Sequence, residues 1–299
     1  MSAARRCATI AILGAPNAGK STLLNRLVGS KLSIVSPKVQ TTRARVLGIA
    51  LRGPAQLIFV DTPGIFAPKR RLERAMVKAA WLGAQETDMA VVVVDAGRGF
   101  DDDTRRIVEG LKAARKRAVL ALNKIDRVKR ETLLPLADSL VKSGIFDAVF
   151  MISARDGDGV EDLADHLAER APEGPWLYPE DQISDLPLRL LAAEVVREQV
   201  FLQLHQELPY SITVETDEWD ERKDGSVRIG ATVHVARDSQ KPIVLGKGGA
   251  QLKRIGSAAR AELERLLERR VHLFLHVRVS EDWFEDRERY AAMRLDFET

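Results

Sequence analysis

Cysteine is nearly absent from this chain of 299 residues. Its single thiol, that of Cys7, excludes a disulfide bond within the chain. Cys7 also stands inside a short apolar segment, which favours a buried structural thiol over a reactive one. Such sparing use of cysteine is typical of proteins in a reducing cytoplasm, and we expect that location here.

Long hydrophobic runs are absent as well. No segment approaches the roughly 18 uncharged apolar residues that a membrane-spanning helix needs. Arg5 and Arg6 precede only a brief apolar stretch, which we interpret as a first strand and not as a signal peptide. We find no internal repeat and no low-complexity tract. These absences argue against integral membrane proteins and repeat arrays.

What is present is an ordinary globular composition, with 45% hydrophobic and 30% charged residues. The length predicts one or two domains, at roughly 100–200 residues each. The net charge of +3 divides unevenly, because residues 1–185 carry +5 and residues 186–299 carry −2. So small a net charge does not by itself indicate nucleic-acid binding. Evidence for such binding has to come from local clusters of basic residues.

The first half of the chain alternates apolar runs with amphipathic helical patterns. Continuous apolar strands separated by helices predict an α/β fold with a mostly parallel, six-stranded sheet and helices on both faces. The second and third runs are joined by residues 52–56 only, so they should form an antiparallel hairpin. The expected strands are Ala8–Leu13, Val46–Leu51, Leu57–Val60, Ala90–Val94, Ala118–Leu122 and Val149–Ile152. The expected helices are Thr22–Val28, Arg71–Gln85, Thr104–Ala114, Leu133–Ser143 and Val160–Glu169.

Proline and glycine are concentrated at Ala171–Trp176, where the alternation of apolar strands and helices ends. A smaller α+β domain is predicted beyond them. Its expected elements are a helix at 188–208, strands at 211–216 and 227–236, a glycine loop after 243–245, a helix at 250–268, a strand at 271–279 and a helical tail from 281. We therefore expect a first domain at 1–175, a linker at 176–185 and a second domain at 186–299.

The first motif joins the first strand to the first helix and reads G-x-x-x-x-G-K-S. In such a P-loop, main-chain N–H groups cradle phosphate oxygens and the helix N-terminus adds its positive dipole. Lys20 can reach the β- and γ-phosphates, and Ser21 can bind Mg²⁺. The nucleotide-binding residues expected here are Gly14, Ala15, Pro16, Asn17, Ala18, Gly19, Lys20, Ser21 and Thr22.

Two further motifs suit the γ-phosphate. Thr42, at the end of the irregular stretch 31–43, could reach Mg²⁺ and close over the phosphate; it is weakly favoured over Thr41. Asp61-Thr62-Pro63-Gly64 follows an apolar strand, so its carboxylate stands at the sheet edge where ligands bind in open α/β folds. Asp61 can hold Mg²⁺ through water, and the Gly64 N–H can contact the γ-phosphate. The expected metal-binding residues are Ser21, Thr42 and Asp61.

Two motifs suit a guanine base. Asn123-Lys124-Ile125-Asp126 follows the fifth strand, and a carboxylate at Asp126 can accept two hydrogen bonds from guanine, whereas adenine offers neither donor. An unpaired buried carboxylate is costly, so adenine should be rejected. The Lys124 stem can lie along the base. Ser153-Ala154-Arg155 follows the sixth strand, where the Ala154 N–H would face the guanine carbonyl oxygen.

The second half carries a G-x-x-G loop, Gly246-Lys247-Gly248-Gly249, at the start of a long helix. Such a loop between two helices is typical of a KH domain, in which the RNA backbone approaches the glycines. The segment 247–270 carries a net charge of +4 in an otherwise acidic domain. The expected RNA-binding residues are Gly246, Lys247, Gly248, Gly249, Lys253 and Arg254. Arg265 and Arg269 more simply form a solvated face with nearby glutamates.

Taken in order, these motifs resemble the Era family of translation-factor-class GTPases. The resemblance is carried first by Gly14–Asn25, Gln40-Thr41-Thr42-Arg43, Asp61–Ile65 and Asn123–Asp126. It continues through Tyr178–Asp185, Glu207–Ser211, Gly246–Gly249 and Arg260–Leu263, so it covers nearly the whole chain. The tail beyond Trp283 matches less well, and nothing is carried over for it.

Members of that family are bacterial GTPases of small-ribosomal-subunit assembly, some of them associated with the membrane periphery. The resemblance therefore implies GTP and GDP with Mg²⁺, a type II KH domain, and binding near the 3′ end of 16S ribosomal RNA. It also implies a cytoplasmic protein, with the inner face of the cell membrane as a second candidate location. We expect a monomer.

The residue after Gly64 is Ile65, where Ras-like GTPases have a glutamine that orients the attacking water. Isoleucine cannot form a hydrogen bond, which predicts slow intrinsic hydrolysis. In related GTPases an asparagine at the position of Asn17 helps to hold a potassium ion, so K⁺ is a further candidate cofactor; a loop-shaping role for Asn17 is the alternative. The expected catalytic residues are Lys20, Thr42, Gly64 and Asn17.

We interpret the chain as a GTP-hydrolysing switch that presents an RNA-binding domain to ribosomal RNA. Two alternatives come from other classes. A P-loop kinase that uses ATP is disfavoured by Asn123–Asp126. An RNA-binding module with an inert nucleotide site is disfavoured by the intact P-loop together with Asp61.

Overall fold

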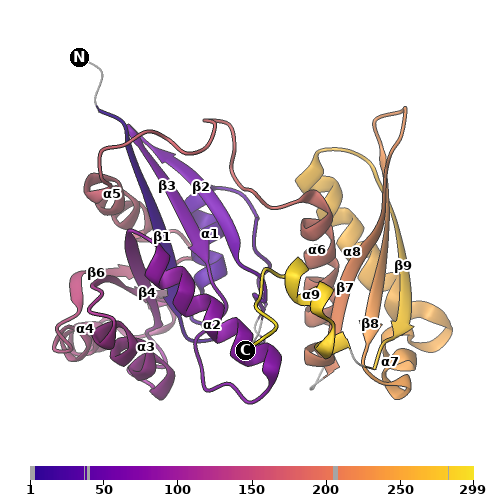
Figure 1. Ribbon diagram of the computed structural model, residues 1–299, viewed down its shortest axis with the longest axis horizontal. Coiled ribbons are helices and arrows are strands. Elements are labelled where there is room, and N and C mark those ends of the chain that lie inside the picture. The colour runs from indigo at the N-terminus through magenta and orange to yellow at the C-terminus, as the bar shows by residue number, and fades with distance from the viewer. Residues whose placement is uncertain (1–3, 37, 39–40, 205–207, 282) are drawn as a thin grey trace. The chain divides into compact units, whose positions relative to one another are not determined.

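The computed structural model describes residues 4–36, 38, 41–204, 208–281 and 283–299. Two residues of the sequence motifs, Gln40 and Glu207, lie outside the described residues. The described chain divides into two compact units, which are treated separately below (Figure 1). The first comprises 1–33, 39–185 and 290–299, and the second comprises 34–38 and 186–289.

The first unit contains a six-stranded sheet in the order β2-β3-β1-β4-β5-β6. Only the β2–β3 pair is antiparallel, and the other four pairings are parallel, as the sequence predicts. The strands are β1 (Arg6–Gly14), β2 (Val46–Arg52), β3 (Ala55–Asp61), β4 (Met89–Asp95), β5 (Ala118–Asn123) and β6 (Phe146–Ile152). Because β1 lies between β3 and β4, the loop after β1 sits at a topological switch point, where open α/β sheets bind ligands.

Helices cover both faces of this sheet (Figure 1). They are α1 (Lys20–Val28), α2 (Arg71–Glu86), α3 (Asp102–Ala113), α4 (Leu133–Val141) and α5 (Val160–Arg170). One buried core joins α2, α3 and α4 to alternate residues of the central strands, among them Leu13, Val92 and Leu120. Residues of the opposite parity in β1, Ile10 and Ile12, are also fully buried. Burial on both faces explains why these strands read as continuous apolar runs.

The second unit is an α+β domain with a three-stranded sheet in the order β7-β8-β9. The β7–β8 pair is antiparallel and the β8–β9 pair is parallel. Its elements are α6 (Leu188–Gln203), β7 (Ile212–Glu221), β8 (Val227–Val235), α7 (Lys241–Leu245), α8 (Ala250–Leu267) and β9 (Val271–Val279). The short α9 (Arg287–Ala292) begins in this unit, and its residues from Tyr290 onward group with the first. The helices α6 and α8 bury Val196, Ile255 and Leu263 against one face of the sheet.

Three details differ from the sequence expectation. Helix α6 ends at Gln203 and not near residue 208, because Leu204 takes an extended backbone conformation. Strand β7 reaches Glu221, five residues beyond its expected end, with a register shift between Thr216 and Glu218. Cys7 is partly and not fully buried; burial is the main cause that raises the pKa of its thiol.

Among the described helices, none combines the length and apolar character required to cross a membrane.

Candidate functional site

The loop between β1 and α1 is closely packed, and glycine is required at both of its ends. A Cβ on Gly14 would lie 2.5 Å from the carbonyl oxygen of Val93. Gly19 has φ +101°, and a Cβ there would lie 2.2 Å from the Asn123 amide. Neither approach is open to a residue with a side chain. The loop therefore has the backbone path that a phosphate cradle needs.

Lys20 begins α1, and its side chain folds back into the loop. Its Nζ donates hydrogen bonds to the carbonyls of Gly14 at 3.2 Å and Ala15 at 3.0 Å. Burial lowers the pKa of Lys20 to about 8, and the charge of Asp61 opposes that shift. A buried ammonium at the centre of the loop is suited to phosphate oxygens, since an anion would compensate its desolvation.

The three residues expected to bind metal lie together. The Ser21 hydroxyl donates to Asp61 Oδ2 at 2.9 Å and lies 2.7 Å from the Thr42 hydroxyl. Thr42 in turn donates to the same carboxylate oxygen at 3.3 Å. Sequence reasoning missed a further donor, Ser33, whose hydroxyl lies 2.9 Å from Asp61 Oδ2. Ser33 belongs to the irregular stretch 31–43, where no pattern distinguishes it.

Asp61 is fully buried, and this burial raises the pKa of its carboxyl against the opposing charge of Lys20. Within the described chain its Oδ1 atom has no hydrogen-bond partner. A buried carboxylate oxygen without a partner is costly unless a cation or a donor compensates it. Oxygen donors from one carboxylate and two hydroxyls are the kind that Mg²⁺ prefers. The residues present therefore fit a magnesium ion, although their ligation of it stays a prediction.

The loop after β3 lies against the P-loop. A Cβ on Gly64 would come within 2.9 Å of the Pro16 nitrogen, so the chain approaches too closely there for any other residue. The Ile65 N–H donates to the Gly14 carbonyl at 3.1 Å, and Thr62 Oγ1 donates to the Ile12 carbonyl at 2.9 Å. The Ile65 side chain is 2% exposed and belongs to the core beneath α2 and α3. It therefore packs in the core and serves no water-orienting role.

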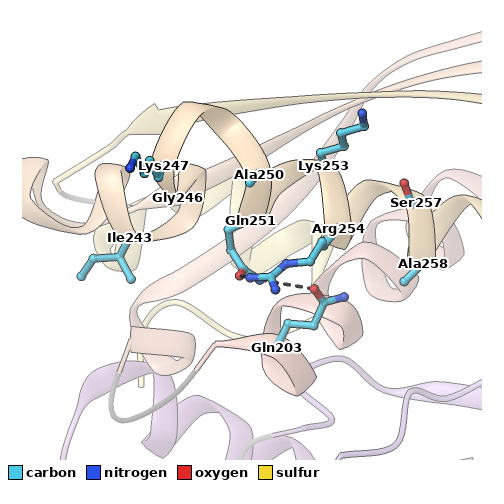
Figure 2. A pocket seen from close by; sticks show the side chains of 10 residues that line it. All are labelled: Gln203, Ile243, Gly246, Lys247, Ala250, Gln251, Lys253, Arg254, Ser257 and Ala258. Atoms are coloured by element: carbon cyan, nitrogen blue, oxygen red, sulfur yellow. Dashed lines mark hydrogen bonds between the residues drawn. The ribbon is translucent and has the colours of Figure 1, made fainter.

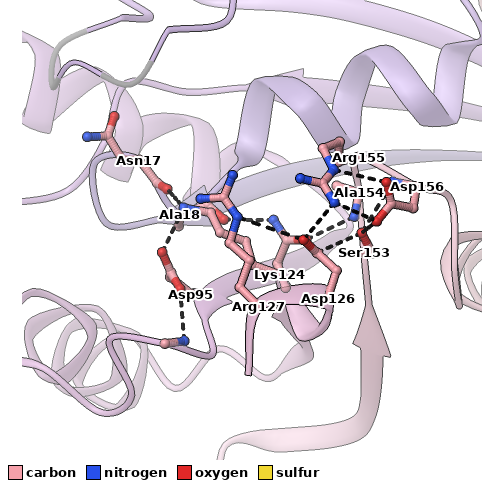
Figure 3. A network of polar contacts seen from close by, with 12 residues as sticks. Asn17, Ala18, Asp95, Lys124, Asp126, Arg127, Ser153, Ala154, Arg155 and Asp156 are labelled. Carbon is pink, nitrogen blue, oxygen red and sulfur yellow. Dashed lines mark hydrogen bonds and ion pairs between the residues drawn. The ribbon is translucent and has the colours of Figure 1, made fainter. Parts of the chain in front are cut away.

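The two expected base-binding loops meet at Asp126 (Figure 3). The Ser153 hydroxyl donates to Asp126 Oδ1 at 2.8 Å, and Arg155 Nη2 lies 3.1 Å from Oδ2. The Ala154 N–H, which the sequence assigns to the guanine carbonyl, here donates to Asn123 Oδ1 at 2.9 Å. That bond secures the neighbouring loop, and the contact of the Ala154 N–H with guanine stays a prediction.

Lys124 links the base loop to the P-loop. Its Nζ donates to the Asn17 carbonyl at 2.6 Å and to Asp95 Oδ2 at 2.7 Å, as Figure 3 shows. The Asn123 amide similarly donates to the Ala18 carbonyl at 2.8 Å. Sequence reasoning missed Asp95, at the end of β4. Its position at the carboxyl edge of the sheet is the signal that could have identified it.

Arg26, in the last turn of α1, was also missed. Its guanidinium donates to the Ala154 carbonyl at 3.3 Å and to the Arg155 carbonyl. The loop that follows β6 is thereby fastened to the helix that follows the P-loop. A single arginine in a helix gives no sequence signal for such a contact.

Four of the expected RNA-binding residues line an open groove of about 1040 Å³ in the second unit, and Gly248 and Gly249 are not among its lining residues (Figure 2). The loop between α7 and α8 has positive φ at Gly246 (+71°), Gly248 (+59°) and Gly249 (+79°), a path that residues with side chains rarely follow. Lys247, Lys253 and Arg254 line the groove.

A glutamine pair closes one side of this groove. Gln251 Nε2 donates to Gln203 Oε1 at 3.3 Å, and Arg254 donates to Gln251. Figure 2 shows these three side chains turned toward one another, with Lys253 extending away from them. Gln203 comes from α6 and was not expected, because only the fold brings it beside α8. The groove thus combines cations for phosphates with amides that can pair with bases.

Comparison with known proteins agrees with this geometry. The family described as 50S ribosome-binding GTPase matches residues 9–124, and the KH domain family matches residues 207–284. GTPase Era of Rhizobium meliloti (strain 1021) is 58% identical over 292 residues, which cover 98% of this chain and 93% of the relative. The chain belongs to the Era family of GTPases. GTPase Era of Caulobacter vibrioides (strain NA1000 / CB15N) is 55% identical over 307 residues, with 98% and 97% covered.

Solved Era structures share the fold over almost the whole chain. A point variant of Aquifex aeolicus Era bound to GDP.AlF4- superimposes with a TM-score of 0.91 at 40% identity, covering 96% of this chain and 98% of that one. Era in complex with MgGDPNP and nucleotides 1506–1542 of 16S ribosomal RNA gives a TM-score of 0.92 at 40% identity, covering 97% and 98%. The α/β GTPase fold followed by a KH domain, predicted from the sequence, is confirmed.

Proposed function

We propose that this chain binds GTP and GDP with Mg²⁺ in its first unit, hydrolyses GTP slowly, and binds the 3′ end of 16S ribosomal RNA through its second unit during small-subunit assembly. The observation that carries the proposal is the whole-chain likeness to an Era bound at once to MgGDPNP and to nucleotides 1506–1542 of that RNA. The cluster of Ser21 and Thr42 on the buried Asp61, together with the basic G-x-x-G groove, supplies the corresponding chemistry in this chain.

The residues divide the work of nucleotide binding. Main-chain N–H groups of residues 17–20 and the Lys20 ammonium hold the phosphates. Ser21, Thr42 and Asp61 would hold Mg²⁺, which neutralises charge that develops on the transferred phosphoryl group. Asp126 accepts hydrogen bonds from guanine, while Ser153 and Arg155 keep its carboxylate in place.

Hydrolysis needs a positioned water, and the side chain of Ile65 is unavailable for that role. In the proposed site the Gly64 N–H, beside Pro16, contacts the γ-phosphate. Thr42 closes over the same phosphate. We propose in addition that the Asn17 side chain helps to hold K⁺ beside the phosphates. In that case the parent protein hydrolyses GTP faster in potassium chloride than in sodium chloride of equal ionic strength, and Asn17→Ala removes the difference.

The proposed location is the cytoplasm, with the inner membrane surface as a secondary site, and the proposed state is a monomer.

Particular residues argue against the two alternative functions, an ATP-dependent kinase and an RNA-binding module with an inert nucleotide site. A kinase that uses ATP would gain nothing from the carboxylate of Asp126 that Ser153 and Arg155 hold. An inert nucleotide site would not need the hydroxyl donors that meet at the buried carboxylate of Asp61.

The nucleotide half of the proposal is tested by Asp126→Asn. An amide can donate to the 2-oxo group of xanthine but cannot accept both guanine donors, so GTP affinity should fall by about tenfold or more and xanthosine triphosphate should bind. Titration of both nucleotides against the parent and the variant measures this. Equal GTP affinity in the two proteins would remove Asp126 from the base site.

The RNA half is tested with the double variant Lys247→Asp/Gly248→Asp. Two carboxylates beside the phosphate path should abolish binding of an RNA that corresponds to nucleotides 1506–1542, with the GTPase rate unchanged. The matched control is Lys223→Asp/Gly225→Asp in the β7–β8 turn, where Gly225 also has positive φ and the charge change is identical. If both variants bind the RNA as the parent does, the contact surface lies elsewhere.

A further inference from the structure

Three successive P-loop carbonyls each accept a hydrogen bond from a side chain outside the loop. Two of the donors, Asn123 and Lys124, belong to the base-binding motif after β5. The third is Arg98, in the loop between β4 and α3, which no sequence motif contains. The three bonds are Arg98 Nη1 to Pro16 O at 3.1 Å, Lys124 Nζ to Asn17 O at 2.6 Å, and Asn123 Nδ2 to Ala18 O at 2.8 Å.

The bond from Arg98 fixes the orientation of one peptide plane. In a trans peptide the C=O and the following N–H point in opposite directions. A Pro16 carbonyl held on Arg98 therefore turns the Asn17 N–H to the opposite side of the loop. Asn17 has φ +64°, in the left-handed region that glycine favours and asparagine enters more readily than other residues. Hydrogen bonds from Arg98 to the Pro16 carbonyl and from Lys124 to the Asn17 carbonyl hold Asn17 in this conformation.

Arg98 is itself held rigidly. The N–H groups of Arg98 and Gly99 both donate to the Asp95 carbonyl at 3.0 Å. The Asp95 side chain accepts from Lys124, so one residue supports both cationic donors. The other end of the guanidinium, Nη2, lies 3.0 Å from Asp101 Oδ2, whose second oxygen caps α3 through the Thr104 N–H at 2.8 Å. The guanidinium thus joins the start of α3 to the P-loop.

The part of the P-loop that Arg98 holds is the part that faces Gly64. Gly64 approaches the Pro16 nitrogen so closely that a Cβ would lie 2.9 Å away. In the proposed site Gly64 contacts the γ-phosphate, whereas Ser21 lies at the other end of the loop and Lys20 reaches the β-phosphate as well as the γ-phosphate. A disturbance at Pro16 and Asn17 should therefore affect the γ-phosphate, which GDP lacks, more than it affects GDP binding.

We propose that Arg98 is a positioning residue for GTP hydrolysis, holding the Pro16 carbonyl so that the Asn17 backbone amide and side chain face the γ-phosphate. The inference rests on the proposed nucleotide site. It assigns Arg98 no contact with the nucleotide: the residue acts through the P-loop backbone. Its positive charge strengthens the hydrogen bond, because a bond from an ionised donor is shorter and stronger than a neutral one.

The test compares Arg98→Ala, Arg98→Lys and a control, Arg106→Ala, in the full chain. Arg106 lies in α3 and pairs with Asp103 at 2.9 Å, so its removal changes the net charge equally without touching the P-loop contact. Arg98→Ala should lower kcat for GTP by about tenfold, with the KM for GTP and the Kd for GDP within about threefold of the parent. Arg98→Lys should recover part of kcat, because an ammonium can still reach one carbonyl but cannot also keep the fork to Asp101.

Amide hydrogen exchange supplies a readout that a merely structural role would not alter. Exchange at residues 17–19 of the GDP-bound protein should quicken in Arg98→Ala and stay unchanged in Arg106→Ala. Asp101→Asn, which retains the cap on Thr104 but weakens the hold on the guanidinium, should lower kcat to a smaller extent; it decides the matter if Arg98→Ala does not fold.

The outcomes separate this inference from the proposed function. If the parent binds and hydrolyses GTP but Arg98→Ala matches Arg106→Ala in kcat and exchange, the inference is wrong and the proposed function stands. If Arg98→Ala weakens GDP and GTP equally with kcat unchanged, Arg98 serves only the shape of the loop, and the inference is again wrong. If the parent does not bind GTP, the proposed function itself fails.

Discussion

At the scale of single residues, the surroundings decide what each carboxylate does. Burial raises the pKa of Asp61 and leaves one oxygen without a partner in the described chain, which suits a cation. Glu215 on β7 shows the opposite behaviour. Its Oε2 lies 3.1 Å from His234 Nε2, and its other oxygen accepts from Arg289. The neighbouring His234, and after it Arg289, hold the pKa of Glu215 at about 2.

The lowered pKa of Glu215 predicts that its contribution to the free energy of unfolding is lost in acid. An unfolded glutamate titrates near 4.5, so the ion pair should stabilise the second unit fully above that pH and lose its effect as the pH falls toward about 2. Allowing for solvent screening at a carboxylate that is 38% exposed, we expect about 1–2 kcal/mol near neutral pH. Urea unfolding of Glu215→Gln and the parent at several pH values measures it.

The control for this prediction is Glu218→Gln on the same strand. Glu218 is 59% exposed and pairs with Arg228 at 3.3 Å, so its loss should cost little at any pH. A difference between parent and Glu215→Gln that persists unchanged below pH 2 would show that the effect is packing and not charge. Ser280, which lies 2.9 Å from His234 Nδ1, is retained in both variants.

The same scale shows what the sequence could reveal. Ser21, Thr42 and Asp61 are recognisable because each stands at a fixed place relative to a strand or to the P-loop, and the fold brings them together. Ser33, Arg26 and Arg98 were not recognisable, since each contacts a residue far away in the sequence. No local spacing of residues encodes such a contact. The contacts from Arg26 to Ala154 and from Arg98 to Pro16 join residues 128 and 82 positions apart.

At the scale of elements, the positions of strands and helices along the chain followed from hydrophobic periodicity, but their ends depended on tertiary contacts. Helix α6 ends at Gln203, five residues before the expected end near 208. Lys38, far away in sequence, donates to the carbonyls of Phe201 and Leu204 there. Carbonyls at a helix end need such partners, and a cation suits the negative end of the dipole. Pro209, directly after the expected end, lies beyond the true end of the helix.

Helix packing in the first unit gives a prediction at this scale. A Cβ on Gly110 in α3 would lie 2.2 Å from Cη2 of the Trp81 ring in α2. The ring cannot yield without disturbing the core beneath both helices, so Gly110→Ala should destabilise the first unit by about 1–3 kcal/mol. The measurement is the midpoint of the thermal transition that GDP shifts, because that transition belongs to the nucleotide-binding unit.

The matched control is Gly174→Ala, where a Cβ would meet no atom within 4 Å. That variant should be neutral or slightly stabilising, because alanine reduces the freedom of the unfolded chain. A Gly110→Ala midpoint as high as that of the control would mean that Trp81 adopts another rotamer at no cost, and that α2 and α3 are less tightly packed than the structure indicates.

At the scale of the whole molecule, the two compact units are not simple halves of the chain. Residues 290–299 group with the first unit, where Asp296 pairs with Lys78 of α2 at 2.6 Å and the Phe297 ring lies 4.7 Å from the Arg71 guanidinium. Residues 34–38 group with the second unit, where the Val35 N–H donates to Glu198 of α6 at 2.8 Å. Each unit therefore contains a segment that the linear order of the sequence places with the other.

From the position of the segment 34–38 we predict that nucleotide binding and RNA binding are coupled. It is flanked by Ser33 and Thr42, whose hydroxyls both bond to Asp61 in the proposed metal site, while Lys38 secures the end of α6 in the proposed RNA-binding unit. A rearrangement of Thr42 on the γ-phosphate would therefore reach α6 through a short covalent path. By linkage, the factor by which GTP raises RNA affinity must equal the factor by which RNA raises GTP affinity.

Lys38→Ala should reduce that factor by about threefold or more while leaving GDP affinity unchanged, since coupling energies of this size are typical of switching proteins. The measurement is RNA affinity in GDP and in a non-hydrolysable GTP analogue, with Lys223→Ala in the β7–β8 turn as a control of equal charge. Because Lys38 bonds to main-chain carbonyls and not to RNA, the variant should narrow the gap between the two nucleotide states without abolishing binding in either. A parallel loss of RNA affinity in both states would instead place Lys38 in the RNA contact surface, and an unchanged ratio would mean that the signal passes by another route.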